Sequence, residues 1–296
     1  DGMSQNSSVR RIVVKGEVGN MQSMGFGEDG LKALAEAVGR SETCQAMDIS
    51  HNVFDPLTPP VWPVLFRSLG GKCVVSGELD LSNSSIDDEG IFALDRFGIC
   101  KNIKVLHLSF TDGIGTAGWK AIANLVKESS TLEELDMNRC NISDEFMLDL
   151  ASALSHNKTL KSLDLGWNEE SITAHGWGAF FGRFQKPEMS GLRKIELTSN
   201  EIDDEAVPSM VRVFSNMHSL EELDLDSIKI TSSGAQAISN ILRNPTSVLK
   251  HLSLDVKEST NDGVIISFVD ALAESRNASL ENLGLHKPSN TLTIRS

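Results

Sequence analysis

The chain is 296 residues long, carries a formal net charge of −14 at pH 7, and contains 40% apolar but only 5% aromatic residues, with no tyrosine. This acidity argues against a generic affinity for nucleic acid or anionic membranes, because both attract clustered Lys and Arg. The sequence contains no run of about 18 apolar residues, so we expect no transmembrane helix.

Residues 1–8 (DGMSQNSS) are polar and predict a flexible N-terminal tail. Residues 9–296 predict a single domain built from a repeated unit, which is clearest at residues 131–154. The first half of this unit has the spacing L-x-x-L-x-L-x-x-(N/C)-x-L, formed by Leu132, Leu135, Met137, Cys140 and Ile142. Its second half has apolar residues at helical spacing. The unit therefore predicts a strand, a turn and a helix that returns the chain for the next parallel strand.

The same unit recurs along the chain in order. After a first strand around residues 12–14, the first position of the pattern recurs every 27 to 32 residues, at Cys44, Ser76, Ile103, Leu132, Leu160, Leu192, Leu220, Leu249 and Leu280. Apolar spacing predicts a helix after each strand up to the ninth, in residues 31–38, 64–69, 90–94, 118–126, 146–154, 177–184, 207–214, 234–242 and 263–272. Pro63 predicts that the second of these helices is short or shifted.

These repeats, over about residues 9–285, resemble the ribonuclease-inhibitor-like class of leucine-rich repeats. The resemblance implies an α/β solenoid (horseshoe) of about ten strands, with a parallel β-sheet on the concave face and α-helices on the convex face. Such a curved stack offers an extended binding surface. Because the terminal repeats otherwise expose their core, either the first loop and residues 291–294 fold over the ends, or the chain is a portion of a longer protein.

The turn position of the repeat predicts a ladder of hydrogen bonds to backbone groups, formed by Asn52, Ser84, Thr111, Cys140, Asn168 and Asn200. The cysteines show no C-x-x-C pair, and two of them, Cys44 and Cys140, occupy core positions of the repeat. We therefore expect reduced thiols and a cytoplasmic or nuclear localisation. The aromatic residues of the sixth helix, Trp177, Phe180, Phe181 and Phe184, have the spacing of a core stripe.

Strand residues alternate between the core and the opposite face, so the residue between the second and third leucines is expected to face the groove. In chain order these residues are Val13, Asp48, Asp80, His107, Asp136, Asp164, Glu196, Asp224, Ser253 and Gly284. Six of the ten are acidic, and such a row favours a basic partner. The alternative is that Asp at this position is a common form of the repeat with no binding role.

His107 lies between Asp80 and Asp136 in this row, so we expect both neighbours to favour its protonated form. A metal site formed by these three residues is a weaker hypothesis, and no metal or other cofactor is predicted.

A second row lies two residues after the third leucine and includes Phe110, Arg139 and Trp167 from consecutive repeats. Aromatic residues and Arg dominate the energetics of many interfaces, so these three are the predicted hot spot. The alternative is that they stack on one another as surface structure.

No phosphate-binding loop, G-x-S-x-G elbow or H-E-x-x-H motif is present in the sequence, and the histidines are scattered. We therefore expect a non-enzymatic scaffold that binds a protein partner with a basic surface through the acidic groove residues, without nucleic acid, membrane or a small-molecule substrate. Two alternatives remain open. The family resemblance also covers GTPase-activating proteins of the Ran-specific type and the ligand-sensing domains of larger receptors.

Overall fold

The computed structural model describes residues 10–14, 30, 33, 36, 44–52, 61–69, 75–255, 262–274, 279–286 and 291–295. The chain forms two compact units, residues 1–140 and 141–296. The predicted tail, residues 1–8, lies outside the described residues, as does most of the helix predicted at residues 31–38. A single domain over residues 9–296 stays a prediction.

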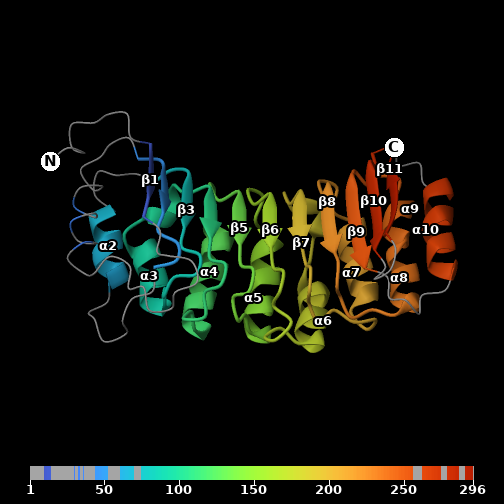
Figure 1. The fold of residues 1–296 in the computed structure, drawn as a ribbon, viewed down its shortest axis with the longest axis horizontal. Helices are drawn as coiled ribbons and strands as arrows, with labels where there is room; N and C mark the ends of the chain where they lie inside the picture. The colour runs from blue at the N-terminus through green and yellow to red at the C-terminus, as the bar shows by residue number, and fades with distance from the viewer. Residues whose placement is uncertain are drawn as a thin grey trace. The chain divides into compact units, whose positions relative to one another are not determined.

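The first unit alternates short strands with helices. Its strands are β1 (Arg11–Val13), β2 (Ala46–Asp48), β3 (Glu78–Asp80), β4 (Val105–His107) and β5 (Glu134–Asp136), and each pairs in parallel with the next. Its helices with described bounds are α2 (Val61–Leu69), α3 (Asp88–Arg96), the 3-10 helix η1 (Ile99–Lys101) and α4 (Thr116–Glu128). Figure 1 shows the strands along one side of this unit and the helices along the other.

The second unit continues the alternation. Its strands are β6 (Ser162–Asp164), β7 (Lys194–Glu196), β8 (Glu222–Leu225), β9 (His251–Asp255), β10 (Asn282–His286) and β11 (Thr291–Arg295). Its helices are α5 (Asp144–Leu154), α6 (Ala174–Arg183), η2 (Pro187–Met189), α7 (Val207–Ser215), α8 (Ser232–Ile238), α9 (Asn240–Arg243) and α10 (Asp262–Glu274). Strands β6 to β10 are parallel, and β11 pairs antiparallel with β10.

The core lies between the strands and the helices of each unit. The central residue of each three-residue strand from β3 to β7 is buried while its neighbours are half-exposed, as the period-2 pattern predicts. Leu79, Leu106 and Leu135 are all 0% exposed in the first unit. The half-exposed neighbours form the surface opposite the helices, which we call the sheet face. The alternation of parallel strands with helices confirms the predicted α/β repeat fold.

The aromatic residues of the sixth repeat belong to the core, as their spacing predicts. Trp177 and Phe181 of α6 are fully buried and stack with ring centroids 5.9 Å apart, and Phe181 meets Phe214 of α7 edge to face at 5.6 Å. Edge-to-face and offset-stacked contacts of this kind add to the free energy gained by burying the rings. The aromatic side chains of α6 therefore pack against α7 of the next repeat.

Three local features modify the repeat, at α2, at the break between α8 and α9, and after β10. Pro63 lies in the first turn of α2, where the missing N–H has no partner to lose, and the helix runs for nine residues. The helix predicted at residues 234–242 is interrupted at Ser239, whose hydroxyl donates to the Gln236 carbonyl at 2.7 Å. The segment after the tenth strand forms β11 and pairs along the edge of β10.

Candidate functional site

The turn that follows each strand is held by the predicted ladder. Asn200 is buried, and its amide nitrogen donates to the Leu197 carbonyl of its own turn and to the Leu165 carbonyl of the preceding repeat, both at 2.9 Å. The thiol of Cys140 reaches the Leu108 carbonyl at 3.0 Å in the same way. The predicted structural role of these turn residues is confirmed.

The row two residues after the third leucine shares one backbone conformation. Seven residues have φ between 48° and 60°, in the left-handed region, namely His51, Asn83, Phe110, Arg139, Trp167, Ser199 and Ser227. In this conformation the chain turns at the end of the strand, and the backbone N–H of the residue can still donate a hydrogen bond to the next repeat. The N–H of Phe110, for example, donates to the Asn138 carbonyl at 2.9 Å. None of the seven is glycine, the residue that adopts such angles most readily, so the sequence did not predict the conformation.

Phe110 and Arg139 lie together, as predicted for neighbouring repeats. The Arg139 guanidinium carbon is 5.4 Å from the centre of the Phe110 ring, which is a cation–π distance. Phe110 is 51% exposed, so the pair forms an aromatic and cationic patch at the edge of the sheet face. Trp167 is 44% exposed and belongs to the second unit.

The acidic positions of the sheet face take part in the turns. The carboxylate Oδ1 of four aspartates accepts a hydrogen bond from the backbone N–H two residues later at 2.7 to 2.9 Å, in the pairs Asp80–Ser82, Asp136–Asn138, Asp164–Gly166 and Asp224–Asp226. Asp therefore has a structural reason to recur at this position, because a short side chain with an oxygen acceptor closes the turn. The charge of the carboxylate is not needed for that bond.

The acidic residues also lie in register on neighbouring strands. In the first unit Asp80 pairs with His107 and His107 with Asp136, and in the second unit Asp164 pairs with Glu196 and Glu196 with Asp224. These side chains are half-exposed. Asp48 differs, because it is only 2% exposed and accepts hydrogen bonds from the N–H and the hydroxyl of Ser50. Its expected place on an accessible groove surface is therefore wrong.

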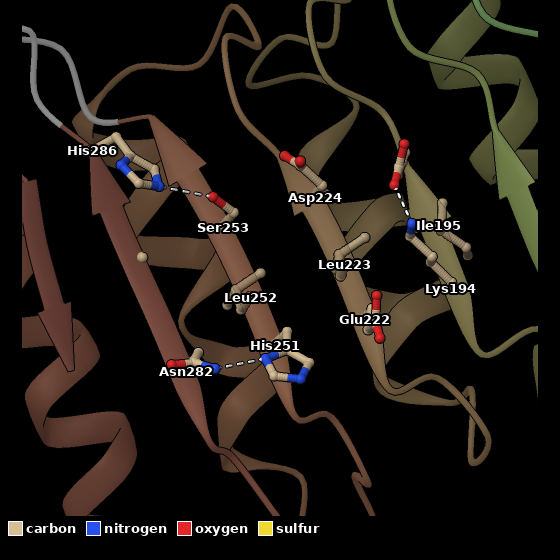
Figure 2. Close-up of a pocket in the computed structure, with 12 residues that line it drawn as sticks. Lys194, Ile195, Glu222, Leu223, Asp224, His251, Leu252, Ser253, Asn282 and His286 are labelled. Atoms are coloured by element: carbon tan, nitrogen blue, oxygen red, sulfur yellow. Dashed lines mark hydrogen bonds and ion pairs between the residues drawn. The ribbon is translucent and has the colours of Figure 1, made fainter. Parts of the chain in front are cut away.

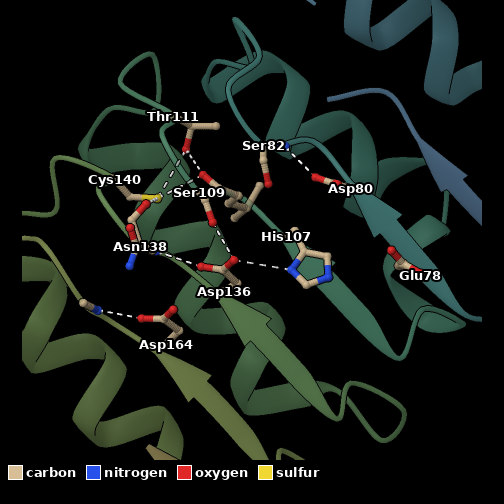
Figure 3. Close-up of polar contacts among 12 residues, drawn as sticks. Glu78, Asp80, Ser82, His107, Ser109, Thr111, Asp136, Asn138, Cys140 and Asp164 are labelled. Atoms are coloured by element: carbon tan, nitrogen blue, oxygen red, sulfur yellow. Dashed lines mark hydrogen bonds and ion pairs between the residues drawn. The ribbon is translucent and has the colours of Figure 1, made fainter. Parts of the chain in front are cut away.

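Figure 3 shows His107 beside Asp136, with Nδ1 of His107 3.4 Å from Oδ2 of Asp136. The hydrogen bond to Asp136 raises the pKa of His107 above its ordinary value; burial opposes this rise, and the charges of Asp136, Asp80 and Glu134 add to it. Burial would raise the pKa of Asp136. However, hydrogen bonds from His107, from the Ser109 hydroxyl (2.5 Å) and from the Asn138 N–H hold it below its ordinary value. The raised pKa of His107 agrees with the expectation, with Asp136 contributing more than Asp80.

A family model described as Leucine Rich repeat matches five segments of the chain, residues 78–94, 100–123, 128–145, 156–173 and 216–239. These segments contain the strands β3, β4, β5, β6 and β8 and the turns that follow them. The chain is a leucine-rich-repeat protein.

Two curated relatives and one solved structure are similar to parts of this leucine-rich-repeat protein. NACHT, LRR and PYD domains-containing protein 12 of Mus musculus is 29% identical over 160 residues, which cover 53% of this chain and 15% of the relative. Protein phosphatase 1 regulatory subunit 37 of Bos taurus is 28% identical over 136 residues, or 46% of this chain and 19% of the relative. A chain of the Rad7 and Elc1 complex in yeast has a TM-score of 0.47 at 17% identity, over 86% of this chain and 65% of that chain. The chain therefore spans less than a fifth of the length of these two curated relatives.

Within the described residues, no group of three or more His, Cys, Asp or Glu side chains is placed to hold a metal ion, and no helix has the length and apolar composition to cross a membrane. Cys44, Cys100 and Cys140 are buried thiols, and burial raises the pKa of Cys100 to about 12. A thiol of such high pKa is a poor nucleophile, because the thiolate is the reactive form.

Proposed function

We propose that this leucine-rich-repeat protein is a non-enzymatic scaffold that binds a protein partner with a basic surface through the acidic residues of its sheet face. Leucine-rich-repeat proteins generally mediate protein–protein interaction. One relative's name describes a regulatory subunit of a phosphatase, which agrees with a binding role.

The register of the acidic residues carries this proposal. Residues on adjacent parallel strands stand about 4.8 Å apart. In the second unit this places Asp164, Glu196 and Asp224 in one row of carboxylates, in which Glu196 is also paired with Lys194 at 2.5 Å. A basic partner would relieve the repulsion within the row. The turn bonds that explain the aspartates use one carboxylate oxygen and leave the negative charge in place.

The patch of Phe110 and Arg139 supplies a different kind of contact in the first unit. An exposed ring beside a guanidinium offers a large contact area and several donors in a fixed arrangement, and such residues often dominate binding energy. We propose Phe110 and Arg139, together with the exposed Trp167 of the second unit, as anchors of the partner.

Affinity capture from a cell extract tests these anchors. Wild-type protein is compared with a Phe110→Ala, Arg139→Ala, Trp167→Ala variant, after both are shown to have the same melting temperature. A partner that is retained by the wild type and lost by the variant supports the proposal, provided that its affinity also falls as salt is raised from about 0.05 M to about 0.5 M. A partner bound equally by both proteins, or bound independently of salt, contradicts it.

We also propose a cytoplasmic or nuclear setting. The buried thiols of Cys44, Cys100 and Cys140 support it, because reduced cysteines are typical of these compartments. Fractionation of cells that express the tagged protein tests the proposal, and recovery in a secretory compartment would contradict it.

A further inference from the structure

The sheet face of the second unit contains a pocket of about 410 Å³. It spreads over β7, β8, β9 and β10 and is lined by two rows of residues in register, first Lys194, Glu222, His251 and Asn282, then Glu196, Asp224, Ser253 and Gly284. Figure 2 shows these strands with Glu222 and Asp224 on β8 and His251 and Ser253 on β9. The volume lies within the range of about 300–1,000 Å³ that is usual for ligand pockets.

The pocket exists because the second row loses side-chain volume from strand to strand. It passes from carboxylates at Glu196 and Asp224 to a hydroxyl at Ser253 and to no side chain at Gly284. The missing side chain also lets the His286 ring lie back over β10, where Nε2 is 3.0 Å from the Ser253 hydroxyl. A Cβ on Gly284 would come within 2.8 Å of that nitrogen.

The charges of the lining favour a cation. With the histidines neutral, three carboxylates and one ammonium group line the pocket, so its formal charge is negative. The ammonium group of Lys194 is 2.5 Å from the Glu196 carboxylate, which largely neutralises both. Glu222 and Asp224 remain as the dominant charges, two residues apart on the same face of β8. That spacing places them about 6.6 Å apart along the strand.

From this pocket and its charges, we propose that it receives an arginine side chain of the protein partner, with Glu222 and Asp224 binding the guanidinium group. The inference rests on the proposed function and gives it a defined anchor in the second unit. Asp224 uses Oδ1 for the N–H of Asp226 at 2.9 Å, so its Oδ2 is the atom offered to the ligand. Among the described residues, Glu222 forms no side-chain hydrogen bond or ion pair, although its charge acts on the ammonium group of Lys194 together with that of Glu196.

The lining suits arginine better than lysine. A guanidinium group has five N–H donors in a fixed plane and can bind two carboxylates at once, whereas an ammonium group acts as a compact point charge. The lining offers further acceptors and a ring beside the carboxylates. The Ser253 hydroxyl oxygen lies on the next strand, and the His251 ring is fixed by Asn282, whose amide nitrogen lies 3.0 Å from Nδ1. Guanidinium groups stack on such rings.

The test is an NMR titration of the whole chain, labelled with 15N, with two matched peptides, acetyl-Gly-Arg-Gly-Arg-Gly-amide and its lysine counterpart. The arginine peptide is expected to shift the amide signals of Asp224, Ser253 and Gly284 and to bind more tightly than the lysine peptide. The double variant Glu222→Gln, Asp224→Asn should weaken arginine binding about tenfold or more, because charge-assisted hydrogen bonds are lost. Asn keeps the turn bond of Asp224, so the strand end is preserved.

A control variant removes the same charge elsewhere. Asp112→Asn with Glu188→Gln changes two exposed carboxylates outside the pocket and should leave arginine binding unchanged. If both variants weaken binding equally, or if the lysine peptide binds as tightly as the arginine peptide, the pocket inference is overturned. If the arginine peptide shifts only signals near Asp80 and Asp136, the pocket inference fails while the acidic-face proposal stands. If neither peptide shifts any signal of the sheet face, both are overturned.

Discussion

The carboxylate of Asp144, in the first turn of α5, holds Thr173, the residue that caps the next helix. Its Oδ1 accepts the Thr173 N–H at 2.9 Å and its Oδ2 accepts the Thr173 hydroxyl at 2.6 Å. The same hydroxyl oxygen accepts the Gly176 N–H inside α6 at 3.2 Å. One repeat therefore fixes the start of the helix in the next repeat.

This arrangement recurs in both units. Asp88 accepts the N–H of Gly115 at 2.6 Å, and Asp204 accepts the N–H and the hydroxyl of Thr231 at 2.8 and 2.5 Å. In each case a glycine lies three residues after the held residue, at Gly118, Gly176 and Gly234, and the carboxylate occupies the space where its Cβ would stand. The glycine is required by this close approach and not by its backbone angles.

The first prediction concerns the glycine at this approach. Gly176→Ala should lower the free energy of unfolding by about 1–3 kcal/mol, because the new Cβ would lie well inside contact distance of Asp144 Oδ1. Gly178 is the matched control in the same helix, since nothing lies within 4 Å of its position for a Cβ. Gly178→Ala should raise stability by about 0.5–1 kcal/mol. Urea denaturation of both variants measures this difference, and equal effects would contradict it.

Most of the fold could be predicted from the sequence because it depends on spacing alone. The leucine positions determine which strand residues are buried. The turn position determines which residues, such as Asn200 and Cys140, form hydrogen bonds to the backbone of the preceding repeat. The contact between Phe110 and Arg139 followed from their equal place in consecutive repeats. These features repeat with the chain, so a periodic pattern determines them.

The remaining features depend on contacts between repeats that a period does not show. Phe110 and Arg139 have left-handed backbone angles, but neither residue is a glycine that would have indicated this conformation in the sequence. The burial of Asp48 is a local exception within a half-exposed row. The pocket arises from the decreasing size of Asp224, Ser253 and Gly284, which becomes meaningful only once their strands are in register. The sequence does hold a signal for the contacts at the helix starts, because Asp at residues 88, 144 and 204 is followed in the next repeat by Gly at residues 118, 176 and 234.

The second prediction concerns the left-handed turn at Phe110, whose φ is 59°. Phe110→Val should cost about 1–2 kcal/mol of stability relative to Phe110→Gly, because β-branched residues rarely adopt this conformation and glycine adopts it readily. Phe92→Val is the control for the change of side chain alone, because Phe92 is 39% exposed and lies in the helix α3 rather than in a left-handed turn. Thermal unfolding compares the variants. If the Phe110→Val protein is as stable as the Phe110→Gly protein, the turn imposes no such constraint.

The third prediction concerns His107. Its pKa should lie above the ordinary value of 6.5, chiefly because of the hydrogen bond to Asp136, and Asp136→Asn should lower it. A raised folded-state pKa stabilises the fold fully below the unfolded pKa, and this contribution is lost as pH rises through the folded pKa. NMR titration of the His107 ring signals in both proteins measures the shift. A wild-type pKa at or below 6.5, or no change in the variant, would refute this account.

The fourth prediction concerns Asp226. Burial, and next the charge of Asp224, raises the pKa of Asp226 to about 6; hydrogen bonds from Ser253 and the charge of His286 oppose the rise, and Asp255 adds to it. Because the folded pKa exceeds the unfolded value of 3.8, the stability contribution is present below about pH 4 and is lost as pH rises through about 6.

Asp226→Asn should therefore be more stable than the wild type at pH 7 and should lose this advantage at pH 4 or below. Asn retains an oxygen that can accept the Ser253 hydroxyl, so the change mainly removes the charge. Urea denaturation across this pH range measures the difference. An advantage that does not depend on pH would mean that titration of Asp226 is not its cause.

The most direct test of the central claim is the affinity of the captured partner for a variant that removes charge from the sheet face and keeps its turns. In Asp80→Asn with Asp164→Asn, each amide oxygen can still accept the N–H of Ser82 or Gly166. The charge-matched control is Asp112→Asn with Glu188→Gln, and the affinities are measured by isothermal titration calorimetry at low and high salt. We predict weaker binding by the sheet-face variant, unchanged binding by the control, and a smaller difference at high salt. Equal affinity of both variants for the partner would contradict this prediction.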